Sequence, residues 1–337
     1  MSLARFLRPA RAVAAAAALA VSAALLSGCA TGTPDAGSTP AATSGEFPVT
    51  VDHAYGEATI PADPERVVTL GWMEADIVTA LGVEPVATSA FPFDKSGIAP
   101  WLAPKLTTTP ALIQTAAAGA DRAPLDLEAI AALHPDLIVA TSYVDLEANY
   151  AGLSVIAPVV GPSAKNIHHL DWKVEAPLIA EALGKTDAVQ PLIDADTATF
   201  AEAGESHPEL KGLTYTLSLA TPNALKVVND TEDGSVRAFD ALGMTFSPTA
   251  AALPALDDGS GAAGLSFETV DKADADRMYV AFLSPDVKTA WQSSAVFPTL
   301  TAVKDGHLVD LSMVQIAALR NPSPLNASYA LSAITGS

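Results

Sequence analysis

Two side chains that can hydrogen-bond an anionic ligand stand at the ends of one short stretch of the sequence. Arg122 carries a guanidinium and Tyr143 a phenol, and both groups donate hydrogen bonds to oxygen atoms that carry negative charge. Between them, apolar residues recur at helical spacing over 127–133, and an uninterrupted apolar run follows at 137–140. The sequence therefore predicts a helix that leads into a buried strand, with one candidate ligand group before the helix and the other after the strand.

Two tryptophans are candidates for the same site. Trp72 follows a predicted buried strand at 66–70, and the loops that leave the carboxyl ends of strands line the ligand crevice of an open parallel sheet. Because Tyr143 also follows a predicted strand, we expect both side chains on the crevice side; the alternative for Trp72 is a packed core position. Trp101 lies in a run rich in Pro and Thr at 91–110, which we expect to be a surface loop.

The helix-and-strand pattern returns in the second half of the chain. The stretch 125–140 matches 265–280 in the pairs Leu125/Leu265, Leu127/Phe267, Glu128/Glu268, Ile130/Val270 and Asp136/Asp276. A pattern repeated in this way is typical of two related structural units. We therefore expect two related α/β halves, in which Glu128 and Glu268 lie at the starts of equivalent helices.

Length and composition bound the fold class. The chain has 337 residues, 50% of them hydrophobic, and its alternating strand and helix signals are typical of a globular α/β protein with two cores. We predict two α/β lobes at 47–186 and 207–337, with the ligand cleft between them. A long interlobe helix at 187–206 joins the lobes and limits their hinge motion. Further predicted elements are strands at 83–86, 155–158, 214–219, 226–228 and 307–311 and helices at 74–81, 171–183 and 325–334.

Residues 1–28 have the pattern of a bacterial lipoprotein signal peptide. Three arginines precede an apolar run at 12–26, which is too short and too rich in Ala for a comfortable membrane span and ends in Leu26-Ser-Gly-Cys29. Cleavage before Cys29 would free its thiol to take a diacylglycerol, and the Thr, Gly, Ser, Ala and Pro mixture at 29–46 would be a flexible linker. The alternative is an ordinary secretion signal with an incidental cysteine. Cys29 is the only cysteine, so an internal disulfide is impossible.

Several function classes are disfavoured. A formal net charge of −20 argues against binding to nucleic acid or to anionic lipid. The histidines, His168-His169 included, show no metal-ligand spacing, so we assign no metal site. Residues 259–264 spell the dinucleotide fingerprint without a preceding strand, and we expect a mobile loop there. A surface-attached hydrolase is disfavoured because no Gly-x-Ser-x-Gly elbow supplies a nucleophile; we assign no catalytic residue and no cofactor.

Two motifs carry a resemblance to a known family. The first is Leu-Glu-x-Ile-x-x-Leu-x-Pro-Asp-Leu-Ile at 127–138, and the second is Leu-Gly-Trp-x-x-x-Asp-x-x-x-Ala-Leu-Gly at 70–82. With them, nearly all of 47–337 resembles the class III substrate-binding proteins of ABC importers, which capture iron-siderophores, haem and cobalamin. Within this family the chain is similar to ferric-hydroxamate binding proteins at four ligand positions, which are Trp72, Trp101, Arg122 and Tyr143.

The resemblance implies a ligand and a mode of binding. Arg122 and Tyr143 would hydrogen-bond the iron-bound oxygens of a ferric hydroxamate, while Trp72 and Trp101 would cover its hydrocarbon linkers. The second lobe departs from the family pattern, because Leu319-Arg-Asn-Pro-Ser323 stands where aromatic residues are expected, and Arg320 is a further candidate contact. Haem or cobalamin capture is the alternative within the family. The protein is expected to act as a monomer, held on the membrane only by its lipid anchor.

The resemblance also implies a docking role for the repeated glutamates. In importers of this family such residues meet arginines on the two permease subunits, one glutamate for each lobe. Glu128 and Glu268 are the matching residues here. The alternative is that each is only an acidic first-turn residue that the helix dipole favours, by about 0.3 to 1 kcal/mol.

Overall fold

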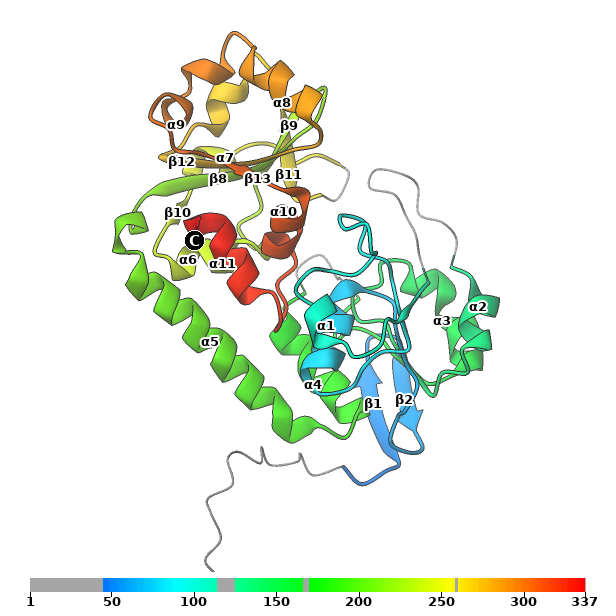
Figure 1. Ribbon diagram of the computed structural model, residues 1–337. Coiled ribbons are helices and arrows are strands. Elements are labelled where there is room, and N and C mark those ends of the chain that lie inside the picture. The colour runs from blue at the N-terminus through cyan, green and yellow to red at the C-terminus, as the bar shows by residue number, and fades with distance from the viewer. Residues whose placement is uncertain (1–44, 114–124, 166–169, 258–259, 337) are drawn as a thin grey trace, which may run out of the picture. The chain divides into compact units, whose positions relative to one another are not determined.

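The computed structural model describes residues 45–113, 125–165, 170–257 and 260–336 (Figure 1). The predicted signal peptide, Cys29, Arg122 and His168-His169 all lie outside the described residues.

The N-terminal lobe is built on a parallel sheet. In the part of the chain that the structure describes, this sheet has five strands in the order β5-β4-β3-β6-β7, each parallel to its neighbour. Its strands are β3 (Val67–Thr69), β4 (Ala87–Thr88), β5 (Ala111–Leu112), β6 (Leu137–Val139) and β7 (Val159–Val160), and a separate antiparallel hairpin is formed by β1 (Val49–His53) and β2 (Gly56–Ile60). The helices are α1 (Trp72–Ala80), α2 (Leu127–Ala132), α3 (Leu146–Ile156) and α4 (Trp172–Ala182), with the 3-10 helix η1 (Ala103–Lys105).

The C-terminal lobe has a mixed sheet. Its described strands run in the order β11-β9-β8-β12-β13, with β10 paired to β8; β9 and β11 are antiparallel to their neighbours and the other pairs are parallel. The strands are β8 (Thr214–Ala220), β9 (Leu225–Val228), β10 (Thr245–Phe246), β11 (Ala262–Leu265), β12 (Arg277–Phe282) and β13 (Leu308–Leu311). The helices are α6 (Val236–Ala241), α7 (Pro248–Ala251), α8 (Pro285–Gln292), α9 (Thr301–Lys304), α10 (Met313–Arg320) and α11 (Ala327–Thr335), with 3-10 helices η3 (Pro208–Leu210), η4 (Val270–Ala273) and η5 (Phe297–Thr299).

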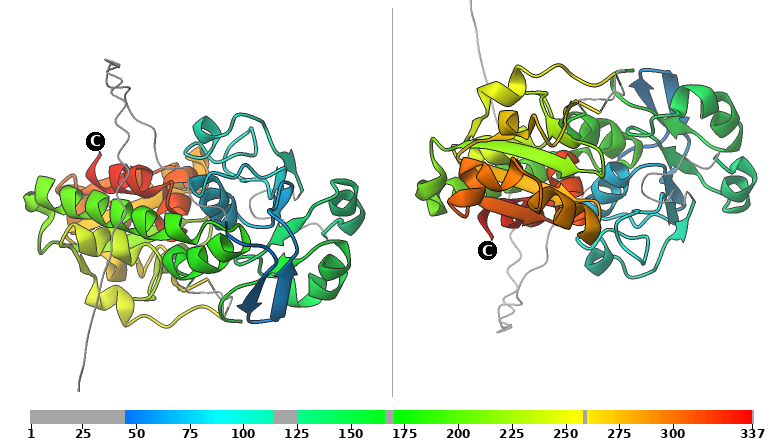
Figure 2. Two further views of the ribbon diagram at one scale, coloured as in Figure 1. Left: turned by 90° about the horizontal axis from the view of Figure 1, so that it is seen from below. Right: turned by 90° about the horizontal axis from the view of Figure 1, so that it is seen from above.

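One long helix connects the two sheets, as predicted. The 3-10 turn η2 (Thr186–Ala188) leads directly into α5 (Val189–Ser206), which has 18 residues and packs against α11 (Figure 1, Figure 2). Pro191 lies in the first turn of α5, where a missing N–H costs little. The prediction of an α/β fold with two sheet-based lobes and an interlobe helix is therefore confirmed.

Charged side chains attach α5 to helices on both sides of it. Asp196 of α5 is 4% exposed, and its Oδ2 atom lies 2.8 Å from Lys173 Nζ on α4 and 2.9 Å from Arg237 Nη1 on α6. The Arg237 guanidinium also lies over the Phe200 ring, at 4.6 Å from its centroid. A single carboxylate thereby ties the interlobe helix to one helix of each lobe.

The sequence repeat is visible in how strands begin. Asp136, just before β6, accepts hydrogen bonds from the backbone N–H groups of Glu65 and Arg66 at 2.8 and 2.9 Å, ahead of β3. Asp276, just before β12, accepts one from the N–H of Thr214 at 2.7 Å, at the start of β8. The matched aspartates therefore have the same task, which is to satisfy backbone donors where the neighbouring strand begins. The matched helices differ, because α2 is an α-helix whereas η4 is a single 3-10 turn.

Three other local predictions were wrong. A strand was predicted at 83–86, but the strand in the structure is β4, which begins one residue later at Ala87. Pro85 has no N–H to donate to the ladder, so it does not belong to the strand. At 155–158 the α3 helix continues to Ile156, with Val155 87% exposed, and pairing starts only after Pro158. Of the loop predicted at 259–264, residues 262–264 instead belong to β11, where Gly264 pairs with Lys226 through backbone groups that need no side chain.

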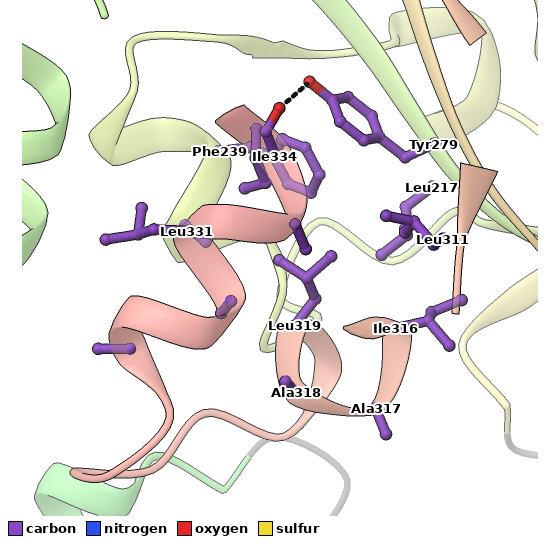
Figure 3. Close-up of a cluster of buried hydrophobic side chains, with 14 of the residues drawn as sticks. Leu217, Phe239, Tyr279, Leu311, Ile316, Ala317, Ala318, Leu319, Leu331 and Ile334 are labelled. Carbon is purple, nitrogen blue, oxygen red and sulfur yellow. Dashed lines mark hydrogen bonds between the residues drawn. The ribbon is translucent and has the colours of Figure 1, made fainter. Parts of the chain in front are cut away.

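The two lobes share a hydrophobic core. Figure 3 shows part of it, where Leu319 of α10 and Leu331 of α11 lie with Phe239 of α6, and Tyr279 donates a hydrogen bond to the Ile334 carbonyl at 3.5 Å. The same cluster of buried side chains includes Trp101 and Leu102 of the N-terminal lobe. Burial of large apolar side chains stabilises by about 1.5 to 3 kcal/mol each, so this common core resists separation of the lobes.

Candidate functional site

The strand order of the N-terminal lobe identifies where a ligand would meet the sheet. From β3 the chain proceeds through β4 and β5 on one side, then crosses to β6 and β7 on the other, so the strand order reverses between β3 and β6. Ligands of open α/β sheets bind beyond the carboxyl ends of the strands at such a switch point. Trp72 directly follows β3, and Tyr143 follows β6, so the structure brings both to this point.

Trp72 is half-buried and oriented by its own hydrogen bond. It is the first residue of α1, and its Nε1 donates to the Ala90 carbonyl at 3.1 Å. Its ring meets the rings of Phe91 and Phe93 edge to face, with centroids 4.9 and 6.2 Å away, and it lines a pocket with Phe91 and Thr88. Because the indole N–H is already paired, Trp72 can offer a ligand apolar surface rather than a hydrogen bond.

Phe93 is a candidate site residue that the sequence analysis missed, and Phe91, which is 2% exposed, is a buried residue that supports it. Both follow β4, so they stand after the carboxyl end of a strand just as Trp72 does. Their position after a strand could have identified them from the sequence. It was missed because the strand was predicted at 83–86, further from both residues than β4 is.

Trp101 is not on a surface loop, and that prediction was wrong. Its side chain is 8% exposed, and its Nε1 donates to Asp76 Oδ2 at 2.8 Å. The ring packs against Phe91 and Tyr329, with centroid separations of 5.3 and 5.4 Å. Trp101 therefore lies inside the core, where little of its area can cover a ligand.

Tyr143 is buried except for a small part of its surface. It is 5% exposed and packs in the cluster around β6, while its hydroxyl accepts a hydrogen bond from Asn149 Nδ2 at 3.2 Å. The packing and the hydrogen bond fix the ring in one orientation.

A buried glutamate clamps the loop that carries Tyr143. Glu74, on α1, is fully buried and accepts hydrogen bonds from Ser142 N at 2.6 Å and Ser142 Oγ at 2.5 Å. Burial raises the pKa of Glu74, against the lowering effect of these bonds. Gly71 makes room for the clamp, because a Cβ there would lie 2.1 Å from Ser142 Oγ. The clamp holds the Trp72 and Tyr143 segments in register with each other.

Replacing Glu74 with Ala should destabilise the protein by about 1 to 3 kcal/mol, because Ser142 would lose both acceptors in a buried setting. Urea denaturation measures the change. Glu147→Ala is the matched control, since Glu147 is an exposed first-turn glutamate on α3 and its loss should cost less than about 0.5 kcal/mol. Equal stability of the two variants would show that the clamp contributes nothing.

Arg320 is held in one orientation by an acidic partner. Its Nε and Nη2 atoms donate to Asp233 Oδ2 at 2.9 and 2.7 Å, and Nη2 also donates to the Ser260 carbonyl at 2.7 Å. Asp233 lies in the loop between β9 and α6 and also accepts from Ser235. The ion pair leaves Arg320 partly exposed, so a preoriented guanidinium stands at the end of α10.

Glu128 and Glu268 are both exposed, but their backbones differ. Glu128 lies in the first turn of α2, whose N-cap Asp126 accepts from Ala129 N at 2.9 Å. Glu268 lies in a turn just before η4, where a hydrogen bond from Ser266 lowers its pKa. The expectation of equivalent helices was therefore wrong, and a shared helix-dipole role does not explain both residues.

The described residues contain no group of three or more His, Cys, Asp or Glu side chains arranged to hold a metal ion. Of the helices within the described ranges, none combines the length and the apolar character that a bilayer crossing requires.

Comparison with known proteins gives matches over most of the chain. The sequence profile of the periplasmic binding protein family matches residues 67–313. The chain is 26% identical over 218 residues to the Fe(3+) dicitrate-binding periplasmic protein FecB of Escherichia coli (strain K12), which covers 62% of this chain and 67% of that protein.

Solved structures agree with the sequence match. A periplasmic solute binding protein from Mycobacterium smegmatis is 26% identical, with a TM-score of 0.70, over 86% of this chain and 98% of that one. PiaA from Streptococcus pneumoniae in complex with ferrichrome is 25% identical, with a TM-score of 0.68, over 85% and 97% of the two chains.

Proposed function

This chain belongs to the periplasmic binding protein family, and from that premise we propose that it is the extracytoplasmic substrate-binding protein of an ABC importer that captures an iron-siderophore complex. It binds its ligand and delivers it to the permease rather than transforming it. The observation that carries the proposal is the similarity to PiaA in its ferrichrome complex, which extends over 85% of this chain.

The ligand class follows from two relatives whose ligands share one chemistry. FecB binds ferric dicitrate and PiaA binds ferrichrome, and both ligands are ferric chelates that supply their own iron-coordinating oxygens. A binding protein then needs only donors for those oxygens and apolar surface for the organic part of the chelate.

The types of the candidate ligand residues suit a ferric hydroxamate in particular. The phenol of Tyr143 and the guanidinium of Arg122 would donate to hydroxamate oxygens, each bond contributing roughly 1.5 to 3 kcal/mol. Trp72 and Phe93, both partly exposed and packed on the buried Phe91 ring, would contact the hydrocarbon linkers. Arg320, oriented by Asp233, would supply a donor from the C-terminal lobe.

Quenching of tryptophan fluorescence tests the ligand class. The purified protein is titrated with ferrichrome, ferrioxamine, ferric citrate, haemin and cobalamin, with each iron-free siderophore as its control. We expect saturable quenching with one equivalent of a ferric hydroxamate and a much weaker response to the iron-free form. Preferential response to haemin or cobalamin would instead support the alternative ligands of this family.

We propose that the protein is located on the outer face of the cell membrane. Cleavage before Cys29 and acylation of its thiol would hold the binding lobes near the permease by lipid chains alone. A Cys29→Ala chain should then leave the membrane fraction; retention there would contradict the anchor.

A further inference from the structure

A buried carboxyl joins the first helix of the N-terminal lobe to the last loop of the chain. Asp76 lies on α1 and is 2% exposed. Its Oδ2 accepts a hydrogen bond from Trp101 Nε1 at 2.8 Å and another from Ser323 Oγ, in the connection between α10 and α11. One oxygen atom thereby holds a segment of each lobe against α1.

The loop at Ser323 is ordered by hydrogen bonds that centre on the same serine that contacts Asp76. Ser323 N donates to Asn326 Oδ1 at 3.0 Å, and Asn326 Nδ2 donates to the Asn321 carbonyl at 2.8 Å. Leu325 N donates to Ser323 Oγ at 3.3 Å. Since one hydroxyl, Ser323 Oγ, both donates to Asp76 and accepts from Leu325 N, movement of this loop away from α1 loosens the bonds inside the loop and exposes the amides of the buried Ser323 and the partly buried Leu325 to water.

The second oxygen of Asp76 is buried without a partner. Among the described residues, no group hydrogen-bonds Asp76 Oδ1, whereas Oδ2 carries both bonds. Trp101 and Ser323 are neutral donors. The titratable group that acts on Asp76 electrostatically is Glu74 on the same helix, whose own pKa is raised by burial and, to a smaller extent, by Glu175 on α4. Within the described part of the chain, no cation pairs with this carboxylate, although a buried charge requires such a partner.

We propose that Asp76 is a proton-dependent joint between the two lobes: the protonated carboxyl keeps the loop at 321–326 closed on α1, and loss of the proton favours separation of that loop. The proton on Oδ1 makes the joint neutral while Oδ2 still accepts both hydrogen bonds. Separation lets water reach the carboxylate and removes the cost of its burial. The joint requires no ligand and goes beyond the proposed function.

The direction of the pH effect on opening follows from the linkage between proton binding to Asp76 and separation of the loop at 321–326 from α1. Desolvation raises the pKa of Asp76 from 3.8 to about 7 in the closed joint, although the bonds from Ser323 and Trp101 oppose the rise. Opening to water lowers that pKa again, so the closed form holds the proton more tightly than the open form. The equilibrium constant for opening therefore rises with pH, by up to about tenfold per pH unit, between the pKa of Asp76 in the open form and its pKa in the closed form. Above the pKa of the closed form it stays constant.

Asp196 provides a contrast within the same molecule. It too is buried and links the lobes, but its carboxylate is paired with Lys173 and Arg237. Asp196→Asn should loosen the attachment of α5 without changing the pH response of the joint at Asp76.

Hydrogen exchange at the amides of Ser323 and Leu325 tests the joint. Their protection, corrected for the intrinsic effect of pH on exchange, should fall from pH 5.5 to pH 7 by roughly tenfold per unit at most, and then level off. In Asp76→Asn, an uncharged mimic of the protonated acid, protection should not change with pH. In Asp196→Asn the pH profile should match the wild type. The same decline in Asp76→Asn, or no decline in the wild type, would overturn the proposal.

A second measurement needs no variant at all. The indole N–H of Trp101 donates to Asp76, so its nitrogen-15 resonance in the intact protein should titrate with a midpoint near neutral pH. A resonance that stays constant from pH 5.5 to pH 8 would show that Asp76 does not change its protonation there, and the joint would be refuted even if Asp76→Asn failed to fold.

Discussion

Glu128→Arg combined with Glu268→Arg should abolish uptake of the ligand by cells while leaving its affinity for the purified protein unchanged. Both glutamates are exposed, one in each lobe, and the importers that this chain resembles meet such residues with permease arginines. Charge reversal would place like charges across that contact, which costs several kcal/mol. Transport of radiolabelled iron as the siderophore complex measures the effect, alongside a binding titration of each protein.

The control must carry the same change of charge elsewhere. Glu57 on β2 and Asp286 on α8 are exposed acidic residues, and Glu57→Arg with Asp286→Arg should transport normally. Normal uptake by the Glu128 and Glu268 double variant, at normal surface abundance, would leave those residues only a local structural role.

Arg122→Ala combined with Tyr143→Phe should weaken ferric-hydroxamate binding by a few kcal/mol, because each lost donor removes a charge-assisted bond worth about 1.5 to 3 kcal/mol. Tyr143→Phe keeps the buried ring and removes only the hydroxyl that Asn149 contacts, so the fold should persist. Fluorescence titration measures the loss of affinity, and circular dichroism verifies the fold.

A matched tyrosine separates binding from packing. Tyr150 lies on α3, and its hydroxyl is 3.4 Å from His53 Nε2 on the β1–β2 hairpin. Tyr150→Phe removes the same atom and should leave the affinity unchanged. A double variant at Arg122 and Tyr143 that binds as tightly as Tyr150→Phe would contradict the placement of the ligand at the switch point.

Several elements were predictable because their signals are local. The helical period around Ile130, the apolar run of β6 and the uninterrupted polar and apolar spacing of α5 each identify an element without reference to the rest of the chain. Predictions failed where a few residues decide between conformations. At Val155 an apolar pair before a proline continued a helix, and at Glu268 a Ser-based turn replaced the expected helix start.

The site was predictable only in part, for a related reason. The positions of Trp72 and Tyr143 after the carboxyl ends of β3 and β6 were predictable, because each follows an apolar run that is visible in the sequence around it. The burial of Trp101 was not, because its partners Asp76 and Tyr329 come from distant segments that only the folded chain brings together. The clamp of Glu74 on Ser142 is likewise a tertiary contact, and neither residue carries a local signal of it.

Capture of a ferric siderophore is tested most directly by native mass spectrometry of the purified protein after incubation with an equimolar mixture of ferrichrome, ferrioxamine, ferric citrate, haemin and cobalamin. A single adduct of one protein chain with one ferric hydroxamate is the predicted result. An adduct with haemin or cobalamin in preference to every ferric chelate, or no adduct with any of the five, would contradict it.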